Sequence, residues 1–236
     1  MRLLSLSCFM LLVFAASPVI AQKTLIIHDP TIQLMDEVPA LPDDEASVYD
    51  EVVLPKLKAK YNAEGCNVDP ELLGEVSGSF TKKGVVQKAA LYQVCVTGNG
   101  LGIVAVVIFE DAKLVGIWGE NSGWAIRINT ISDLNSNGID ELALSFGGGL
   151  HQGKGGVGVE IIEFDKLKPQ ILGWFQAEQS MDGTPESAWK VSVKTGKTPA
   201  FYRQRYKANR QGKLIKFGVN AMFKLTKVEN NFEPIS

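Results

Sequence analysis

The most informative stretch of this chain, residues 133–144, reads DLNSNGIDELAL. Polar residues alternate around Gly138 and lead directly into the apolar run Leu142-Ala143-Leu144. Asn tolerates left-handed backbone and Gly has no side chain to accommodate, so the first part predicts a tight loop. The apolar run predicts a buried strand immediately after that loop.

The same order of loop and strand recurs on both sides of this stretch. Upstream, the polar residues 79–84 precede the apolar run Ala89-Ala90-Leu91. Residues 103–111 also match residues 157–165, since both runs are rich in Val and Ile. Short strands that repeat at about 50 residues are typical of blade-like antiparallel units. We therefore expect an all-β, mainly antiparallel fold made of blade-like β-meander repeats at about 72–120, 126–178 and 188–228; the alternative is a coincidence of β pattern.

A single helical segment is expected before the repeats. Asp43-Asp44-Glu45 places acids where a helix N-terminus favours them. Apolar residues then recur at near-helical spacing, namely Val48, Val52, Leu54, Leu57 and Tyr61. Pro55 interrupts this pattern, because proline lacks an N–H and clashes with the preceding turn. We expect one kinked helix or two short ones between about 44 and 62, within a single β-rich domain over residues 43–236.

The first 21 residues have the pattern of a secretory leader. Arg2 supplies the positive start, residues 3–14 are almost all apolar, and Val19-Ile20-Ala21 ends in a small residue. We expect cleavage after Ala21 and an exported, periplasmic or extracellular protein. No stretch is long and apolar enough to span a bilayer. Residues 22–42, with three prolines, are expected to form an extended lead-in without regular structure.

Export makes the cysteines informative. Cys8 lies in the leader, so the mature chain keeps Cys66 and Cys95. A pair in an oxidising compartment predicts a disulfide. The alternatives are two buried thiols, or a redox pair, which would require the absent C-x-x-C spacing.

Oxygen atoms at alternate positions of the 133–141 loop can also converge on a hard cation such as Ca²⁺, which takes six to eight oxygens. The candidate ligands are the side chains of Asp133, Asn135, Asn137 and Glu141 and the backbone carbonyl of Ile139. The loop is not an EF-hand, whose twelfth position carries Glu where this chain has Leu144.

The loop resembles the D-x-[DN]-x-[DN]-G-x-x-[DE] loop of FG-GAP/VCBS-type repeats, the calcium loops of integrin-α-like β-propellers. The resemblance rests on this one loop, because the neighbouring repeats are degenerate. It implies a Ca²⁺ site in which Asp140 faces away. Asn137 stands where the family usually has Asp, so we expect weak binding, with a dissociation constant of roughly 0.1–1 mM. The alternative is a turn without a metal.

The C-terminal part of the chain is strongly basic. From Trp189 to Lys227 there are eleven basic residues and no acid. On a strand, Arg203, Arg205 and Lys207 share one face. This face predicts a docking surface for an acidic envelope polymer or protein. The alternative is a solvated face that is partly neutralised by the acid-rich residues 29–51; nucleic acid is excluded by the exported location.

No catalytic motif is evident. The chain has two histidines, His28 and His151, and no serine in a G-x-S-x-G turn. We therefore favour a calcium-stabilised β-repeat protein that acts by binding an envelope or extracellular partner rather than by catalysis. The alternative is a hydrolase of envelope polymers that uses a carboxylate pair the sequence does not reveal.

Overall fold

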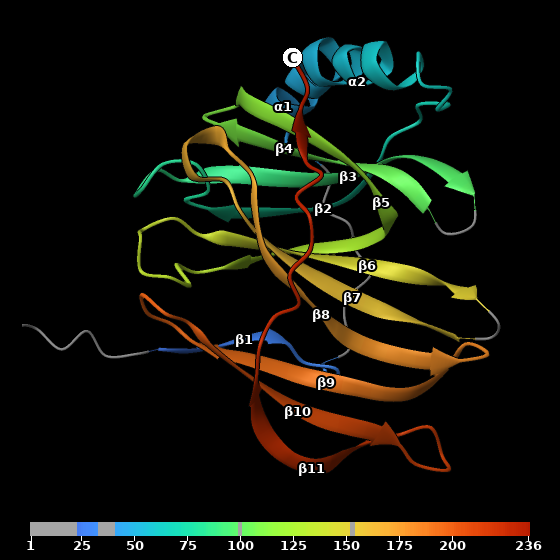
Figure 1. Ribbon diagram of the computed structural model, residues 1–236. Helices are drawn as coiled ribbons and strands as arrows, with labels where there is room; N and C mark the ends of the chain where they lie inside the picture. The colour runs from blue at the N-terminus through green and yellow to red at the C-terminus, as the bar shows by residue number, and fades with distance from the viewer. Residues whose placement is uncertain (1–22, 33–40, 99–100, 152–153) are drawn as a thin grey trace, which may run out of the picture.

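The computed structural model describes residues 23–32, 41–98, 101–151 and 154–236, and it is dominated by a twelve-stranded antiparallel sheet (Figure 1). The strands from β2 to β11 follow one another in chain order, each paired with the next. The predicted fold class, mainly antiparallel β-structure with a short N-terminal helical segment, is confirmed. The strands are β1 (Thr24–His28), β2 (Glu71–Gly78), β3 (Gln87–Gly98), β4 (Leu101–Glu110), β5 (Lys113–Ile131), β6 (Glu141–His151), β7 (Lys154–Glu163), β8 (Gln170–Met181), β9 (Thr184–Lys194), β10 (Ala200–Ala208), β11 (Leu214–Phe223) and β12 (Glu233–Pro234).

Strand β5 changes partner half-way along its length. Its first half pairs with β4 as far as Gly123, and its second half pairs with β6 from Trp124 onwards. The sheet therefore bends into layers, which Figure 1 shows stacked one above another. The first layer holds β2–β4 and the start of β5, the second holds the end of β5 with β6–β8, and the third holds β9–β11 with β1.

Alternation along the strands buries both faces of the central layers. Val107 on β4 packs toward the helices, whereas its neighbour Val106 packs toward the second layer. On β7, Ile162 belongs to that same inter-layer core, and Ile161 packs toward the third layer. Because successive strand residues point to opposite faces, one strand can supply two cores. This explains why the central strands read as nearly continuous apolar runs.

The helical segment covers the outer face of the first layer. It consists of α1 (Asp43–Val48), a π-helical turn (Tyr49–Val53) and α2 (Leu54–Tyr61). In the π turn the N–H of Leu54 reaches the carbonyl of Tyr49, a wider turn at the place where Pro55 would otherwise break the hydrogen-bond ladder. None of the helices in the described ranges is long and apolar enough to cross a membrane.

The N-terminal strand β1 lies within the predicted lead-in, residues 22–42. It pairs with β9, and its Leu25 and Ile27 pack on the third core. The expectation of no regular structure is therefore wrong for residues 24–28, because their apolar side chains alternate at strand spacing and pack on the third core beside β9. The predicted leader, residues 1–21 with cleavage after Ala21, lies outside the described residues.

The disulfide between Cys66 and Cys95 is present, as predicted. Cys66 follows α2 and Cys95 lies on β3, so the bond fastens the helical segment to the first layer. The C-terminal segment then crosses the layers in the opposite direction, as Figure 1 shows. Its Thr226 pairs with Trp174. Phe232 enters the core between the first and second layers, and Ile235 enters the core between the helices and the first layer.

Candidate functional site

The predicted cation loop connects β5 to β6 and contains three residues with left-handed backbone. These are Asp133, Ser136 and Gly138, with φ angles of 34°, 64° and 88°. A Cβ atom at Gly138 would also lie 2.5 Å from the side chain of Lys83, which packs over the loop. The backbone conformation therefore favours glycine at this position, whereas the exposed Lys83 side chain could move aside.

Two asparagine side chains hold the loop in its turn. Asn135 Oδ1 accepts a hydrogen bond from the N–H of Asn137 at 3.1 Å, and Asn137 Oδ1 accepts one from the N–H of Ile139 at 2.7 Å. Each is a local bond from a backbone N–H to an Asn two residues earlier, which is ordinary turn chemistry. Groups of the loop itself therefore support its turn conformation.

Glu141 is the most deeply buried of the predicted ligands. Its side chain has no solvent exposure, and Oε2 accepts a hydrogen bond from the N–H of Leu134 at 2.8 Å. The other oxygen, Oε1, is buried without a hydrogen-bond partner, and so is Oδ1 of Asp133. Burial, and then the charges of Glu163 and Asp133, raise the pKa of Glu141 to about 8. An unpaired buried carboxylate oxygen is destabilising unless a cation or a proton compensates it.

Glu163, at the end of β7, belongs to the same cluster and was not predicted. Its Oε2 accepts hydrogen bonds from Nδ2 of Asn135 and Nδ2 of Asn137, both at 2.7 Å, and the residue is only 6% exposed. The pairing of Leu142 with Ile162 brings the end of β7 beside the start of β6. The sequence does show an acidic residue at the end of an apolar strand. Its place in the cluster could be predicted only if the pairing of β6 with β7 were known.

The carboxylate of Asp140, which the resemblance expects to face away from the site, bonds to two backbone N–H groups. Its Oδ2 accepts a hydrogen bond from the N–H of Ser79 at 2.8 Å, and its Oδ1 accepts one from the N–H of Asp133 at 3.0 Å. The N–H of Asp140 in turn donates to the carbonyl of Ser79 at 2.9 Å. Asp140 thus ties the loop to the segment that follows β2 in the first layer.

The oxygen atoms of the cluster fit a hard cation, provided that the amides of Asn135 and Asn137 turn their oxygens toward it. Asp133, Glu141 and Glu163 offer carboxylate oxygens, two of them buried without partners. As arranged, however, the amino groups of Asn135 and Asn137 point at Glu163, so both amides would have to present their oxygens instead. Within the described ranges no three His, Cys, Asp or Glu side chains are already grouped to hold a metal. Ile139 lies buried at the end of the loop, next to these groups in sequence.

The predicted basic residues do lie together, in a row along β10. Each is placed over an aromatic ring: Arg203 over Phe223 at 5.1 Å, Arg205 over Trp189 at 5.6 Å and Lys207 over Phe217 at 4.1 Å. The cross-strand register explains these contacts, since Arg205 pairs with both Trp189 on β9 and Phe217 on β11. We call Arg203, Arg205, Lys207, Trp189 and Phe217 the basic–aromatic face.

A bulge in β11 shapes this face. Arg203 pairs with Ala221 and Arg205 with Phe217, so β11 has extra residues around Gly218, whose φ is 73°. Gln204, on the opposite side of β10, fills the bulge by donating to the carbonyls of Phe217 and Gly218. The bulge leaves a shallow groove of about 350 Å³ between Trp189, Arg205 and Phe217. The aromatic members of the face were not predicted from the sequence.

A comparison of this chain with protein-family models, curated proteins and solved structures found no match. The resemblance of the 133–141 loop to FG-GAP/VCBS calcium loops therefore stays a prediction.

Proposed function

We propose that this protein is an exported binding module, stabilised by calcium, that docks an acidic polymer or acidic protein on its basic–aromatic face. The observation that carries the proposal is the row of three cations on β10, each held over an aromatic ring. Stacking restricts a long side chain before the partner arrives, so less conformational entropy is lost when it binds.

The charges on the two sides of β9 and β10 are arranged differently, and this difference supports the proposal. Lys190, on the reverse side, forms an ion pair with Asp29 of the acid-rich N-terminal region. In the described ranges no acid pairs with Arg203, Arg205 or Lys207, and Arg205 instead donates to the hydroxyl of Ser187. Asp29 thus neutralises Lys190 on the reverse side, and the cations of the basic–aromatic face are left for an external anion.

Calcium has a structural part in this proposal. The cation would be held by Asp133, Asn135, Asn137, Glu141, the carbonyl of Ile139 and, in addition, Glu163. It would supply positive charge to carboxylates that are buried together, and it would fasten the β5–β6 loop to the end of β7. None of these residues belongs to the basic–aromatic face, and the proposed role of calcium is to stabilise the fold rather than to contact the partner.

One observation favours the alternative function, a hydrolase of envelope polymers. Burial and the charge of Glu160 raise the pKa of Glu120 to about 7, and burial also raises the pKa of Glu160. Carboxyl pairs of this kind serve as acid and base in glycoside hydrolysis. Glu120 lines a cavity of about 480 Å³ with residues of α2 and the C-terminal segment, but Glu160 does not line that cavity. The pair thus lacks a shared opening to substrate, and binding is the better-supported function.

The proposal is tested by the retention of the mature protein on immobilised acidic polymers, with neutral dextran as the reference. We expect retention on polygalacturonate or heparin and elution at raised salt, because exposed charges attract through a screened potential. Retention on dextran of equal strength, or no retention on any acidic polymer or acidic protein, would contradict the proposal.

A further inference from the structure

A groove floored by glycines lies on the second layer, between the ends of β7 and β8. It has a volume of about 510 Å³, within the range of small-ligand sites, and Gly148, Gly155, Gly156 and Gly158 contribute to its floor. A Cβ atom at Gly156 would lie 2.2 Å from the carbonyl oxygen of Glu178, and one at Gly158 would lie 2.3 Å from Nε1 of Trp174. Gly156 and Gly158 are therefore required by the close approach of β8, and the glycines leave the floor without side chains.

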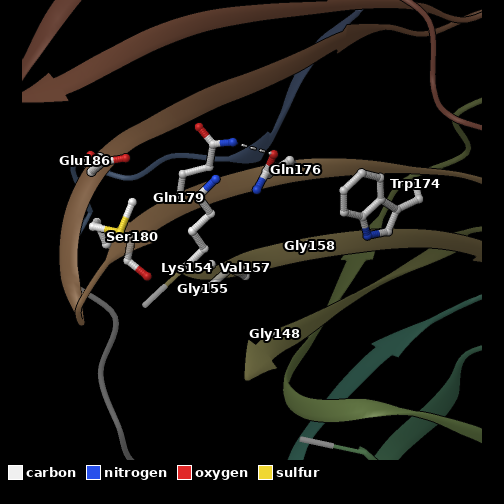
Figure 2. Close-up of a pocket in the computed structure, with 12 residues that line it drawn as sticks. Gly148, Lys154, Gly155, Val157, Gly158, Trp174, Gln176, Gln179, Ser180 and Glu186 are labelled. Carbon is white, nitrogen blue, oxygen red and sulfur yellow. Dashed lines mark hydrogen bonds between the residues drawn. The ribbon is translucent and has the colours of Figure 1, made fainter. Parts of the chain in front are cut away.

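Three side chains of β8 stand in a row along this groove. Figure 2 shows Trp174, Gln176 and Gln179 in that order, with Gly158 beside the indole and with Lys154 and Glu186 toward the far end. Gln179 Nε2 donates to Gln176 Oε1 at 3.1 Å. Gln176 and Gln179 reach the same side because a bulge in β8 pairs them with Gly158 and Gly156. The groove thus offers one apolar ring and two planar amides.

This combination matches the chemistry of a sugar ring. A pyranose presents C–H groups on one face, which suit an aromatic ring, and hydroxyls at its edge, which suit amides that both donate and accept. The two charged side chains at the groove, Lys154 and Glu186, are of opposite sign. The groove itself therefore carries no excess charge and suits the ring of a sugar rather than an isolated anion.

The strand register links one end of the groove to the basic–aromatic face. Gln179 pairs with Ser187, and Ser187 pairs with Lys207. Paired residues of an antiparallel sheet point to the same side, so Gln179 and Lys207 flank Ser187 on one surface. Arg205 also donates to Ser187 Oγ, at 2.8 Å from Nη2 and 3.2 Å from Nε. Ser187 itself is only 2% exposed, so a polymer that crosses β9 here would pass over it and meet amides on one side and cations on the other.

From this juxtaposition we propose that the partner is an acidic polysaccharide, with a sugar ring stacked on Trp174, hydroxyls bonded to Gln176 and Gln179, and carboxylate or sulfate groups held by Arg205 and Lys207. The proposal rests on the proposed function and narrows its partner to one class. If it is correct, the affinity for the polymer depends on its sugar rings as well as on its negative charge.

The test compares two ligands in calcium-free buffer: an oligogalacturonate, which has sugar rings and charge, and a polyphosphate, which has charge alone. Trp174→Ala and the double variant Gln176→Ala/Gln179→Ala are measured by titration calorimetry. Trp124→Ala is the matched control, because Trp124 is 45% exposed and pairs with Gly147, on the opposite side of β6 from Gly148. If Trp174→Ala disturbs the fold, the double glutamine variant still tests the groove, because it leaves the indole in place.

We expect both groove variants to weaken oligogalacturonate binding by about tenfold, while polyphosphate binding stays within about twofold of wild type. The Trp124→Ala control should match wild type with both ligands. If the groove variants bind oligogalacturonate as wild type does, or if wild type binds polyphosphate but no oligogalacturonate, the polysaccharide inference is wrong and the basic–aromatic face is unaffected. If Arg203→Glu/Arg205→Glu retains full affinity for both ligands, the proposed function itself fails.

Discussion

Asn137 donates a 2.7 Å hydrogen bond from Nδ2 to Glu163, a residue 26 positions later in the chain. The bond joins the β5–β6 loop to the end of β7. Its donor is a neutral amide, whereas in the proposed calcium-bound state the metal ion would compensate the charge of Glu163. Asn135 makes the same bond to the same oxygen. The negative charge of Glu163 can therefore be compensated either by the two amide groups or by a metal ion. Experiments can distinguish these two states.

Calcium should raise the melting temperature of the mature protein. With a dissociation constant of roughly 0.1–1 mM, about 10 mM calcium would stabilise the folded state by about 1–3 kcal/mol, a shift of a few degrees. Magnesium should substitute poorly, because it requires a smaller octahedral shell. Asp133→Ala should abolish the calcium effect, whereas Asp182→Ala, which alters another turn residue with positive φ, should preserve it. Identical melting in calcium and in chelator would exclude the metal site.

Replacement of both asparagines by aspartate should have opposite effects with and without calcium. In chelator, Asn135→Asp/Asn137→Asp loses two donors to Glu163 and adds like charges beside it, so we expect a loss of at least about 2 kcal/mol of stability. In calcium the two new carboxylates should tighten binding, since ligand charge raises affinity. Calorimetry and thermal melts measure both effects. A variant that is as stable as wild type in chelator and binds calcium no better would refute this account of the loop.

The loop and the disulfide could be predicted because their signals are local or compositional. The Asn and Gly residues of the 133–141 loop specify a turn by themselves, and only one pairing is left once Cys8 is assigned to the predicted leader. Glu163 could not be predicted, because its place in the cluster depends on the pairing of β6 with β7. The same holds for Trp174, Trp189 and Phe217, which become neighbours of polar groups only through sheet register and bulges.

The layered arrangement of the sheet could not be predicted from the sequence either. The runs of Val and Ile predicted strands, but an apolar run does not say which of its residues face which core. Val106 and Val107 are adjacent and serve different cores, because β4 is covered on both faces. The partner change of β5 at Trp124 likewise has no marker in the sequence.

Removal of the disulfide should destabilise the protein without changing its sheet. The bond closes a span of 29 residues between Cys66 and Cys95, for which the loop-entropy model gives about 3–4 kcal/mol. We expect Cys66→Ser/Cys95→Ser to unfold at correspondingly lower urea concentration and to keep the circular dichroism of the wild type. Thiol titration of the denatured, unreduced wild type should find no free cysteine in the mature chain. Two free thiols would contradict the assignment.

Glu120 should make the stability fall as the pH rises from about 4.5 to 7. Burial and the charge of Glu160 raise its pKa in the folded state from the ordinary 4.5 to about 7. The unfolded chain therefore releases this proton first, and ionisation favours unfolding across that window and not above it. Glu120→Gln cannot ionise and should be more stable than wild type at pH 8 by up to about 3 kcal/mol.

The comparison requires urea unfolding of wild type and Glu120→Gln at pH 4.5 and at pH 8. Glu51→Gln, on the exposed side of the π turn, is the matched control and should follow wild type. If the stability difference between wild type and Glu120→Gln is the same at both pH values, Glu120 does not hold its proton in the folded state.

The most direct test of the central claim is the affinity of the charge-reversed variant Arg203→Glu/Arg205→Glu for an acidic polymer, at low and at physiological salt. The control Lys56→Glu/Lys58→Glu makes the same change in net charge on α2, away from the basic–aromatic face. We predict that the β10 variant binds at least about tenfold more weakly at low salt and loses most of its salt dependence, while the α2 variant stays close to wild type. Equal weakening in both variants would mean that net charge alone drives binding, and undiminished binding by the β10 variant would show that the partner does not dock on this face.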